Sequence, residues 1–240
     1  MITGIDYSQF QESNGKHPDL NGLSFAFHKA TEGSGWVDPN LSTDLQTIRK
    51  AGLVCGVYHF FHSFHDADAQ AAWFLKNYHP EIGDIIALDW ESGGYDTAGK
   101  DRWIHTVKSR YPHNKVGVYC NRDYMAHLNN HYGDFLWIAD PGSPAGSPRT
   151  GNLPWKFHQY SSAGNLDHDV ARFNSRQELR TWAGFPAPVH TTLPQMYTVN
   201  AGDTLARIAV MHHTTWQILA TLNHLANPNL IFPGEKLRVR

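Results

Sequence analysis

The chain has 240 residues, a formal net charge of −2 at neutral pH, and 41% hydrophobic and 12% aromatic residues. This composition suffices for a packed core and excludes a disordered or fibrous chain. The lack of a basic excess excludes the electrostatic field that draws proteins to nucleic acid phosphates, so we expect no nucleic acid partner. Cys55 and Cys120 each lie in an apolar run and are interpreted as free buried thiols.

The first 173 residues alternate between strand-like and helix-like patterns. Runs of apolar, β-branched and aromatic residues predict eight strands, over Ile2–Asp6, Ser24–Ala30, Val54–Phe61, Ile85–Glu91, Val116–Cys120, Phe135–Ala139, Lys156–Tyr160 and Leu166–Phe173. Helical patterns separate the earlier strands, over Leu41–Ala51, Ala67–Asn77, Lys100–Arg110 and Arg122–Tyr132. Such repeats predict an α/β fold, a TIM-like (β/α)-barrel. Residues 139–156 have no helical period, so we expect an irregular barrel with helices missing in its second half and some antiparallel pairing.

The remainder of the chain predicts a boundary and a second, smaller domain. Ser175 to Glu178 has the form of a capping box and predicts a short closing helix. Residues 184–195 contain three prolines and no periodicity, which is typical of a linker. Residues 196–240 predict a strand, two helices and a strand, with Asp203 and Thr214 as helix N-caps. We therefore expect a barrel domain at residues 1–183, a linker at 184–195 and a βααβ module at 196–240.

Carboxylates lie near one end of several predicted strands. They are Asp6, Asp89, Glu91, Asp167 and Asp169. The C-terminal ends of parallel barrel strands converge on one mouth, so these groups are expected to meet there. Strand alternation places Asp89 and Glu91 on one face and Trp90 on the other. Neighbouring acids raise one another's pKa, and one protonated carboxyl beside an ionised one is what glycoside hydrolysis requires. An isolated acid is more often a solvated loop residue, but a pair that ends an apolar strand needs another reason.

Other chemistries find little support. His59, His62 and His65 form a His-x-x-His-x-x-His series, but strand geometry places the first two on opposite faces and no HExxH helix accompanies them. We therefore expect no metal and no cofactor. The N-terminal residues show no basic region, apolar stretch or cleavage site, and no apolar run reaches 18 residues, so neither a secretion signal nor a membrane partner is expected.

At these residues the chain resembles the family 25 glycoside hydrolases, the lysozymes of many bacteriophage endolysins and bacterial wall hydrolases. The resemblance covers roughly residues 2–173 and rests on seven blocks in order: Gly4 to Ser8, Phe27 to Gly33, Gly56 to Phe60, Leu88 to Glu91, Gly117 to Tyr119, Leu136 to Ala139, and His158 to Tyr160 leading to Asp169 and Phe173. The chain departs from the usual family residues at Tyr7, His28, Trp36 and Asp140. None of these departures removes a carboxylate from the set.

The resemblance implies cleavage of the β-1,4 bond between N-acetylmuramic acid and N-acetylglucosamine in peptidoglycan, with retention and without a metal. It makes Glu91 the general acid/base, with Asp6, Asp89 and Asp169 as acidic partners. The nucleophile stays open. Asp6 or Asp169 could attack directly, or the substrate's acetamido oxygen could attack while Asp89 orients it. We favour the acetamido route because Asp89 shares a face with Glu91.

Sugar-binding residues are also implied in both domains. In the barrel, Tyr58, Tyr119 and Trp137 are candidate sugar contacts, with core packing as the alternative. The last 45 residues resemble a LysM module, from Tyr197-Thr198-Val199 through Gly202 to Leu205 and Asn229 to Gly234. The resemblance implies that N-acetylglucosamine units contact Gly202, Asp203, Thr204, Asn229, Leu230 and Ile231. Leu205, Ile208 and Leu219 are interpreted as core.

Two other functions compete with a wall-anchored muramidase. One is a non-catalytic glycan-binding protein on a degenerate barrel, and the other is a hydrolase of chitin. The complete set of acids favours the muramidase, because a degenerate barrel is expected to lose some of them. We expect a monomer that binds bacterial peptidoglycan. By analogy with endolysins, we also expect it to be made in a host cytoplasm by a bacteriophage and released at lysis.

Overall fold

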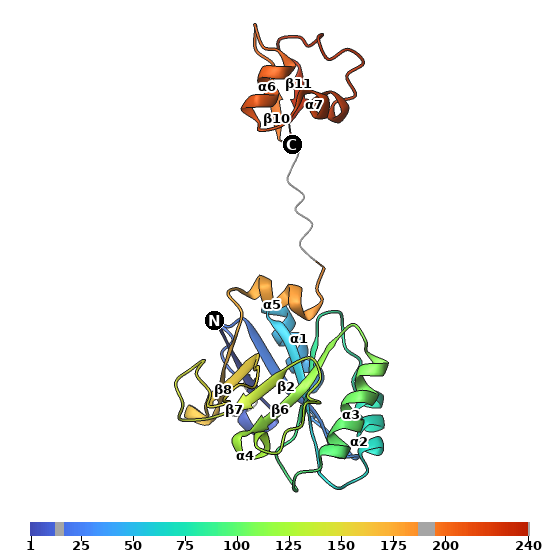
Figure 1. Cartoon of the computed structure of the whole chain (residues 1–240), viewed down its shortest axis with the longest axis vertical. Coiled ribbons are helices and arrows are strands. Elements are labelled where there is room, and N and C mark those ends of the chain that lie inside the picture. Colours follow the sequence, from blue (N-terminus) through green and yellow to red (C-terminus); the bar gives the residue numbers. More distant parts are fainter. Residues whose placement is uncertain (13–16, 187–194, 240) are drawn as a thin grey trace. The chain divides into compact units, whose positions relative to one another are not determined.

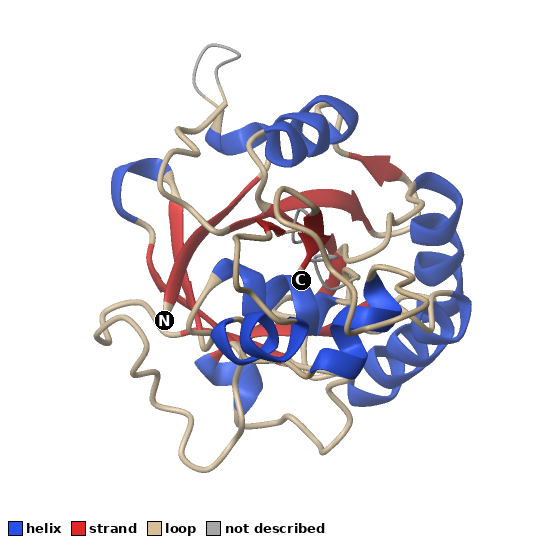
Figure 2. Cartoon of the chain, turned by 90° about the horizontal axis from the view of Figure 1, so that it is seen from above, coloured by secondary structure: helices blue, strands red, loops and turns tan. Residues whose placement is uncertain are grey.

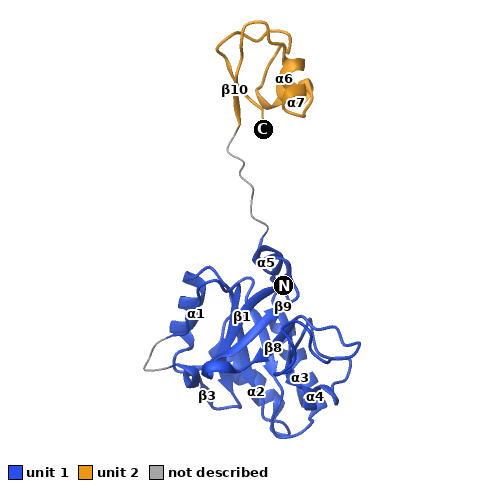
Figure 3. Ribbon diagram, turned by 90° about the vertical axis from the view of Figure 1, so that its left-hand side faces the viewer, with its two compact units in different colours: residues 1–186 blue, residues 187–240 orange. Residues whose placement is uncertain are grey.

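The computed structural model describes residues 1–12, 17–186 and 195–239 of the chain. These form two compact units, residues 1–186 and 187–240 (Figure 3). Most of the predicted linker, residues 187–194, lies outside the described residues. Residues 184–186 belong to the first unit, where Phe185 packs against the barrel core and over the Arg180 guanidinium.

A closed ring of eight strands forms the centre of the first unit (Figures 1 and 2). The strands are β1 (Ile2–Tyr7), β2 (Phe25–Glu32), β4 (Val54–Phe60), β5 (Ile85–Asp89), β6 (Lys115–Asn121), β7 (Leu136–Ala139), β8 (Phe157–Ser161) and β9 (Asp167–Ala171). Pairing is parallel from β1 through β2 and around the ring to β8. Strand β9 is antiparallel to both β8 and β1 and closes the ring. The short β3 (Trp36–Val37) pairs with β2.

Helices cover the barrel unevenly, which confirms the predicted irregular α/β barrel (Figure 2). In the first half, α1 (Leu41–Lys50), α2 (Ala67–Asn77) and α3 (Thr97–Arg110) connect successive strands. In the second half the described connections hold only α4 (Arg122–Met125) and a 3-10 turn, η2 (Ala163–Asn165). Another 3-10 turn, η1 (Gln9–Gln11), follows β1, and α5 (Arg176–Ala183) closes the unit. As predicted, the Ser175 hydroxyl caps α5 by accepting from the Glu178 backbone N–H at 3.1 Å.

The predicted helix over Arg122–Tyr132 is wrong beyond Met125. The buried Lys100 side chain reaches into this segment and donates to the Asn129 amide oxygen at 3.0 Å and to the His131 carbonyl. Together with the ion pair to Asp101, these acceptors satisfy a buried ammonium that would be costly to leave unpaired. The segment therefore runs as a loop that supplies oxygen acceptors to α3.

The side chains of each strand alternate between two apolar cores. Inside the ring, Phe27, Trp137 and Phe157 form an aromatic cluster, with Phe27 and Trp137 stacked at 4.3 Å between ring centroids. Outside the ring, Ile86 and Leu88 of β5 pack toward the helices. The alternation of β5 therefore directs Asp89 inward and Trp90 outward, as predicted.

The second unit has the predicted βααβ order. Strands β10 (Met196–Thr198) and β11 (Lys236–Arg238) pair antiparallel, and α6 (Leu205–Met211) and α7 (Trp216–Leu222) lie between them in sequence. Its core contains the predicted Leu205, Ile208 and Leu219. Among the described residues of both units, no helix has the length and apolar character needed to span a bilayer.

The predicted N-caps Asp203 and Thr214 of this unit are wrong by one residue. Thr204 and Thr215 cap the helices by accepting from the backbone N–H groups of Arg207 and Ile218. The Asp203 carboxylate instead accepts from the Tyr197 hydroxyl at 2.9 Å and from the Asn200 backbone N–H at 2.8 Å. It stabilises the turn before the helix, so the adjacent hydroxyl is left to cap.

Candidate active site

Four carboxylates line one cavity at the end of the barrel where the parallel strands finish. The cavity has a volume of about 370 Å³, and the four are Asp6, Asp89, Glu91 and Asp167. Asp6 lies near the end of β1, and Asp89 and Glu91 lie at and just beyond the end of β5. Asp167 is opposite Asp6 in the register of β1 and β9. Because β9 is antiparallel, its first residue reaches the mouth, which corrects the expectation that strands meet there only by their C-terminal ends.

Glu91 has the properties of a proton donor. It lines the cavity half-buried, and the Asn121 amide nitrogen donates to its Oε2 at 3.5 Å. Burial raises the pKa of Glu91 above its usual value, and the charge of Asp167 adds to the rise. A carboxyl whose pKa rises toward neutrality stays protonated long enough to act as a general acid.

Asp89 faces the cavity with an unused acceptor. It is buried, and its Oδ1 has no hydrogen-bond partner within the described part of the chain. Burial, followed by the charge of Glu91, raises the pKa of Asp89 well above its usual value. A buried acceptor without a donor costs folding free energy, so this atom is available to a donor on a bound ligand.

Asp6 is held by a chain of side-chain hydrogen bonds. The Gln159 amide nitrogen donates to Asp6 Oδ2 at 2.7 Å, and the Tyr119 hydroxyl donates to the Gln159 amide oxygen at 3.1 Å. Burial and the charge of Asp167 raise the pKa of Asp6 to about 7. Gln159 was not predicted as a site residue. A buried polar residue on the inward face of β8 is the sequence signal that could have identified it.

Asp169 lies deeper than the other acids. It is only 1% exposed, does not line the cavity, and accepts from the indole N–H of Trp137 at 2.8 Å. Burial and the charge of Asp6 raise its pKa well above the usual value. Of the two acids of β9, Asp167 therefore lines the cavity, whereas Asp169 is buried next to Asp6.

The predicted aromatic contacts all line the cavity, at its base. Tyr58 and Tyr119 are buried with ring edges toward Trp137, at 6.5 and 4.7 Å between centroids. Both rings also belong to the core inside the barrel, which was the alternative interpretation. Each ring therefore packs in the core and borders the cavity. Phe10, which is 68% exposed, also lines the cavity and was not predicted as a site residue. Its place in η1, shortly after Asp6, is the signal that could have identified it.

Other polar residues in and near the cavity form ion pairs or hydrogen bonds with neighbouring side chains. Lys29 lines the cavity and forms an ion pair with Glu32. Of the histidine series, His59 hydrogen-bonds Thr31 through Nδ1 at 2.7 Å and stacks on Trp103, whereas His62 lies 3.2 Å from a Glu32 oxygen. His59 and His62 thus contact different neighbours.

A smaller groove lies within the second unit. Its volume is about 320 Å³, and it brings together the predicted Asp203, Thr204, Asn229 and Ile231. The predicted Gly202 and Leu230 do not line it. Instead it includes Trp216, whose side chain is 44% exposed and which the sequence reasoning missed. An exposed indole at the start of α7 offers a flat apolar face of the kind that packs on sugar rings.

The raised pKa of Asp6 predicts a pH effect on stability. The unfolded chain releases this proton near the ordinary aspartate pKa of 3.8 and the folded chain near a pKa of about 7, so between these values the folded state binds more protons. The free energy of unfolding should therefore fall as pH rises from about 5 to 8. Asp6→Asn should make this fall shallower in urea unfolding followed by tryptophan fluorescence. Asp140→Asn is the control, because Arg149 holds the pKa of Asp140 near 2; an Asp6→Asn slope as steep as the wild type would contradict the assignment.

The fold and the cavity together define a class of protein. It is an α/β barrel whose mouth gathers carboxylates, and the pKa of Asp6, Asp89 and Glu91 is raised, an arrangement suited to general acid–base chemistry. The chain belongs to the glycosyl hydrolases family 25, which it matches over residues 5–169, and residues 197–240 match the LysM domain.

Individual proteins agree with this assignment. The uncharacterized protein YegX of Escherichia coli is 33% identical over 180 residues, covering 69% of this chain and 65% of its own length. This chain thus spans just under two thirds of that relative. Lysozyme M1 of Streptomyces globisporus is 26% identical over 199 residues, covering 72% of this chain and 68% of its own. The structure of a family 25 glycosyl hydrolase from Bacillus anthracis superposes with a TM-score of 0.65 at 22% identity, over 76% of this chain and 94% of that one, which supports the fold.

Proposed function

We propose that the protein is an N-acetylmuramidase that hydrolyses the β-1,4 bond between N-acetylmuramic acid and N-acetylglucosamine in bacterial peptidoglycan, with retention. The observation that carries the proposal is that Glu91, with its raised pKa, lines the same cavity as Asp6 and Asp89. Membership of family 25 and the similarity to a protein named lysozyme support it. The acids needed for catalysis are all present, which argues against a degenerate, purely glycan-binding barrel.

In the proposed mechanism Glu91 protonates the glycosidic oxygen as the bond to the sugar breaks. The acetamido oxygen of the same sugar attacks its anomeric carbon and forms a cyclic intermediate. The unpartnered Oδ1 of Asp89 accepts from the acetamido N–H and stabilises the positive charge that develops there. Glu91, now ionised, then removes a proton from the water that opens the intermediate.

Direct attack by Asp6 or Asp169 fits the contacts less well. Asp6 is engaged by Gln159, whose amide nitrogen donates to its Oδ2 at 2.7 Å. Asp169 does not line the cavity and is engaged by Trp137. We therefore assign Asp6 and Asp169 to shaping the field around Glu91, and assign Tyr58, Tyr119 and Trp137 to the base on which a sugar rests.

The chemical ends of the products test the proposal. Digestion of purified peptidoglycan should release fragments with N-acetylmuramic acid at the new reducing end, identified by borohydride reduction and mass spectrometry. The first product seen by proton NMR should carry the β anomer. New reducing ends at N-acetylglucosamine, an initial α anomer, or faster release of ends from chitin than from peptidoglycan would each contradict the proposal.

We assign wall attachment to the groove of the second unit. Asp203, Thr204, Asn229 and Ile231, with Trp216, are proposed to bind N-acetylglucosamine units, and Gly202 and Leu230 to shape the loops that carry them. Such attachment raises the concentration of the enzyme at its polymer, so we propose that the protein acts at the bacterial cell wall. We also propose that it acts as a monomer.

Removing residues 187–240 should weaken the action on whole walls far more than the action on soluble fragments. The reason is that tethering raises local concentration without changing the chemical step, and losses of about 10²-fold are within its range. Rates on intact walls and on short soluble glycans, measured for both forms of the protein, provide the check. Trp216→Ala in the full chain is the matched variant and should reproduce part of the loss on walls. An equal loss on both substrates would show that the second unit supports the barrel instead.

A further inference from the structure

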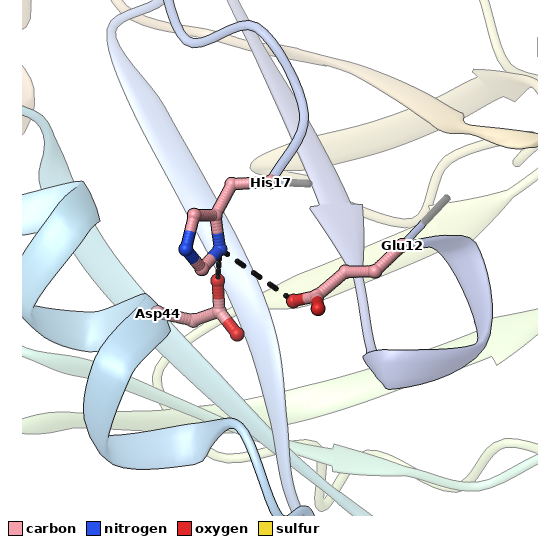
Figure 4. Close-up of side chains that lie close together, drawn as sticks. All are labelled: Glu12, His17 and Asp44. Atoms are coloured by element: carbon pink, nitrogen blue, oxygen red, sulfur yellow. Dashed lines mark hydrogen bonds and ion pairs between the residues drawn. The ribbon is translucent and has the colours of Figure 1, made fainter. Parts of the chain in front are cut away.

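A second group of titratable side chains lies on the outer side of the barrel, beside α1. Glu12 follows η1, His17 lies between η1 and β2, and Asp44 is in the first turn of α1 (Figure 4). The Nδ1 atom of His17 is 2.5 Å from Asp44 Oδ1 and 3.6 Å from Glu12 Oε1. One ligand atom from each of the three residues lies within 4.8 Å of the others. Both carboxylates thus converge on a single ring nitrogen.

Two oxygen atoms in this group are buried without a partner. The Asp44 side chain is fully buried and that of Glu12 is 5% exposed, whereas His17 is 32% exposed. Glu12 Oε1 and Asp44 Oδ2 have no hydrogen-bond partner within the described part of the chain. The other two oxygens are fixed, because the Asn40 amide donates to Glu12 Oε2 at 2.6 Å and the Tyr7 hydroxyl to Asp44 Oδ1 at 3.1 Å. The carboxylates are therefore held in place by neighbours while acceptors remain unused.

Carboxylates outnumber basic groups around this cluster in the described part of the chain. Beyond His17, the nearest ionisable neighbours are His28, whose Nε2 is 3.7 Å from Asp44 Oδ2, and Asp38, 3.4 Å from the same nitrogen. Among the described residues no lysine or arginine pairs with these carboxylates. Three acids thus face two imidazoles.

We propose that Glu12, His17 and Asp44 bind one divalent transition-metal ion, for which Zn²⁺ is the best match. Zinc binds imidazole nitrogen and carboxylate oxygen at about 2.0 to 2.2 Å, so tetrahedral ligand atoms are about 3.4 Å apart. The 3.6 Å between His17 and Glu12 matches this spacing. The 2.5 Å between His17 and Asp44 is a hydrogen bond that opens when the ion replaces the proton, a movement that the partly exposed His17 permits. Imidazole disfavours Ca²⁺ and Mg²⁺, which prefer oxygen ligands alone.

The position of the site gives the ion a structural role at the cavity. Glu12 directly follows Phe10 and Gln11, which line the substrate cavity, and Asp44 belongs to α1. A bound ion would therefore tie the segment after β1 to a helix of the barrel. This departs from the expectation of a metal-free chain, which considered only the catalytic acids and the His59 series. Two of its ligands come from the segment between η1 and β2 and the third from α1, with no recognised spacing, so the sequence offers no motif for it.

Zinc titration of the full chain tests the site. The protein is treated with EDTA, dialysed, and titrated with zinc chloride by calorimetry, with thermal unfolding followed in parallel. One saturable equivalent and a higher unfolding temperature are expected, with neither effect from Mg²⁺. Loss of a ligand in His17→Gln should weaken binding by about 10-fold or more, judging from the 10- to 100-fold cost of losing even an outer-shell partner. His65→Gln, which changes an exposed histidine of the other series, should bind as the wild type does.

Several results would contradict the proposed metal site. No one-equivalent binding by the wild type, unchanged binding by His17→Gln, or a loss confined to His65→Gln would each overturn the site. Metal-free His17→Gln should unfold at a somewhat lower temperature than the metal-free wild type, because it loses the hydrogen bond to the buried Asp44, so Glu12→Gln gives a second binding test. Cobalt in place of zinc should show the visible absorption of a nitrogen- and oxygen-ligated ion in the wild type and lose it in either variant. None of these readouts depends on hydrolytic activity.

Discussion

Glu91→Gln is expected to lower hydrolysis of peptidoglycan by about 10² to 10⁴-fold, the usual contribution of a general acid. Glutamine has nearly the same shape and can keep a contact with Asn121, but it cannot give a proton to the leaving oxygen. The groove of the second unit is unchanged by this substitution, so binding to insoluble walls should be retained. Turbidity loss of wall suspensions and release of reducing ends measure the first effect, and co-sedimentation with walls measures the second.

Glu81→Gln provides the matched control for that substitution. Glu81 precedes β5, so it lies toward the opposite end of the strand from Glu91, and its side chain is 68% exposed beside Arg49. Its replacement should leave hydrolysis within a factor of two or so, as most surface substitutions do. Lysis by Glu91→Gln at the rate of this control would reject Glu91 as the proton donor, whatever the fate of wall binding.

The barrel can be predicted from the sequence because the patterns that indicate its strands and helices are local. Apolar runs such as Ile85–Asp89 lie between helical patterns, and their order alone predicts a closed ring. The direction of β9 was left open, although a signal existed. Only residues 162–166 separate β8 from β9, and a parallel crossover needs a dozen residues or more. The false helix after Met125 had no such signal, because Lys100 ends it from a distant part of the chain.

The sequence predicts the candidate site only in part, because register and contacts between strands are not local signals. Alternation along β5 predicts that Asp89 and Glu91 share a face. Alternation along β9 gives Asp167 and Asp169 the same face too, but it cannot say which of them reaches the mouth. That depends on the register with β1, where Asp6 faces Asp167. Gln159 enters the site through hydrogen bonds to Asp6 and Tyr119 on two other strands, so its polar character on β8 marks it as a candidate but does not identify its partners.

Asp89→Asn is expected to lower hydrolysis by about 10² to 10³-fold, a typical cost of losing one charge-stabilising group. An amide still fills the space but cannot oppose the positive charge of the cyclic intermediate. The stability of the fold should not fall along with the activity. Asp89 is a buried acid with raised pKa, so the wild type loses stability as pH rises toward neutrality, and the uncharged variant does not. At pH 7 the variant should therefore unfold at an equal or higher urea concentration while its activity has fallen.

Comparison with Asp6→Asn decides between the two nucleophiles. If the acetamido group attacks, Asp6→Asn retains more activity than Asp89→Asn, and glycan with de-N-acetylated muramic acid is not cleaved by the wild type. If Asp6 attacks, Asp6→Asn is the more damaged variant, and a glycosyl adduct on Asp6 accumulates with a slow substrate, visible by mass spectrometry. The second pattern would overturn the role given to Asp89 while leaving Glu91 as the acid. The unused oxygen of Asp89 favours the first, because its missing donor is the group that the substrate brings.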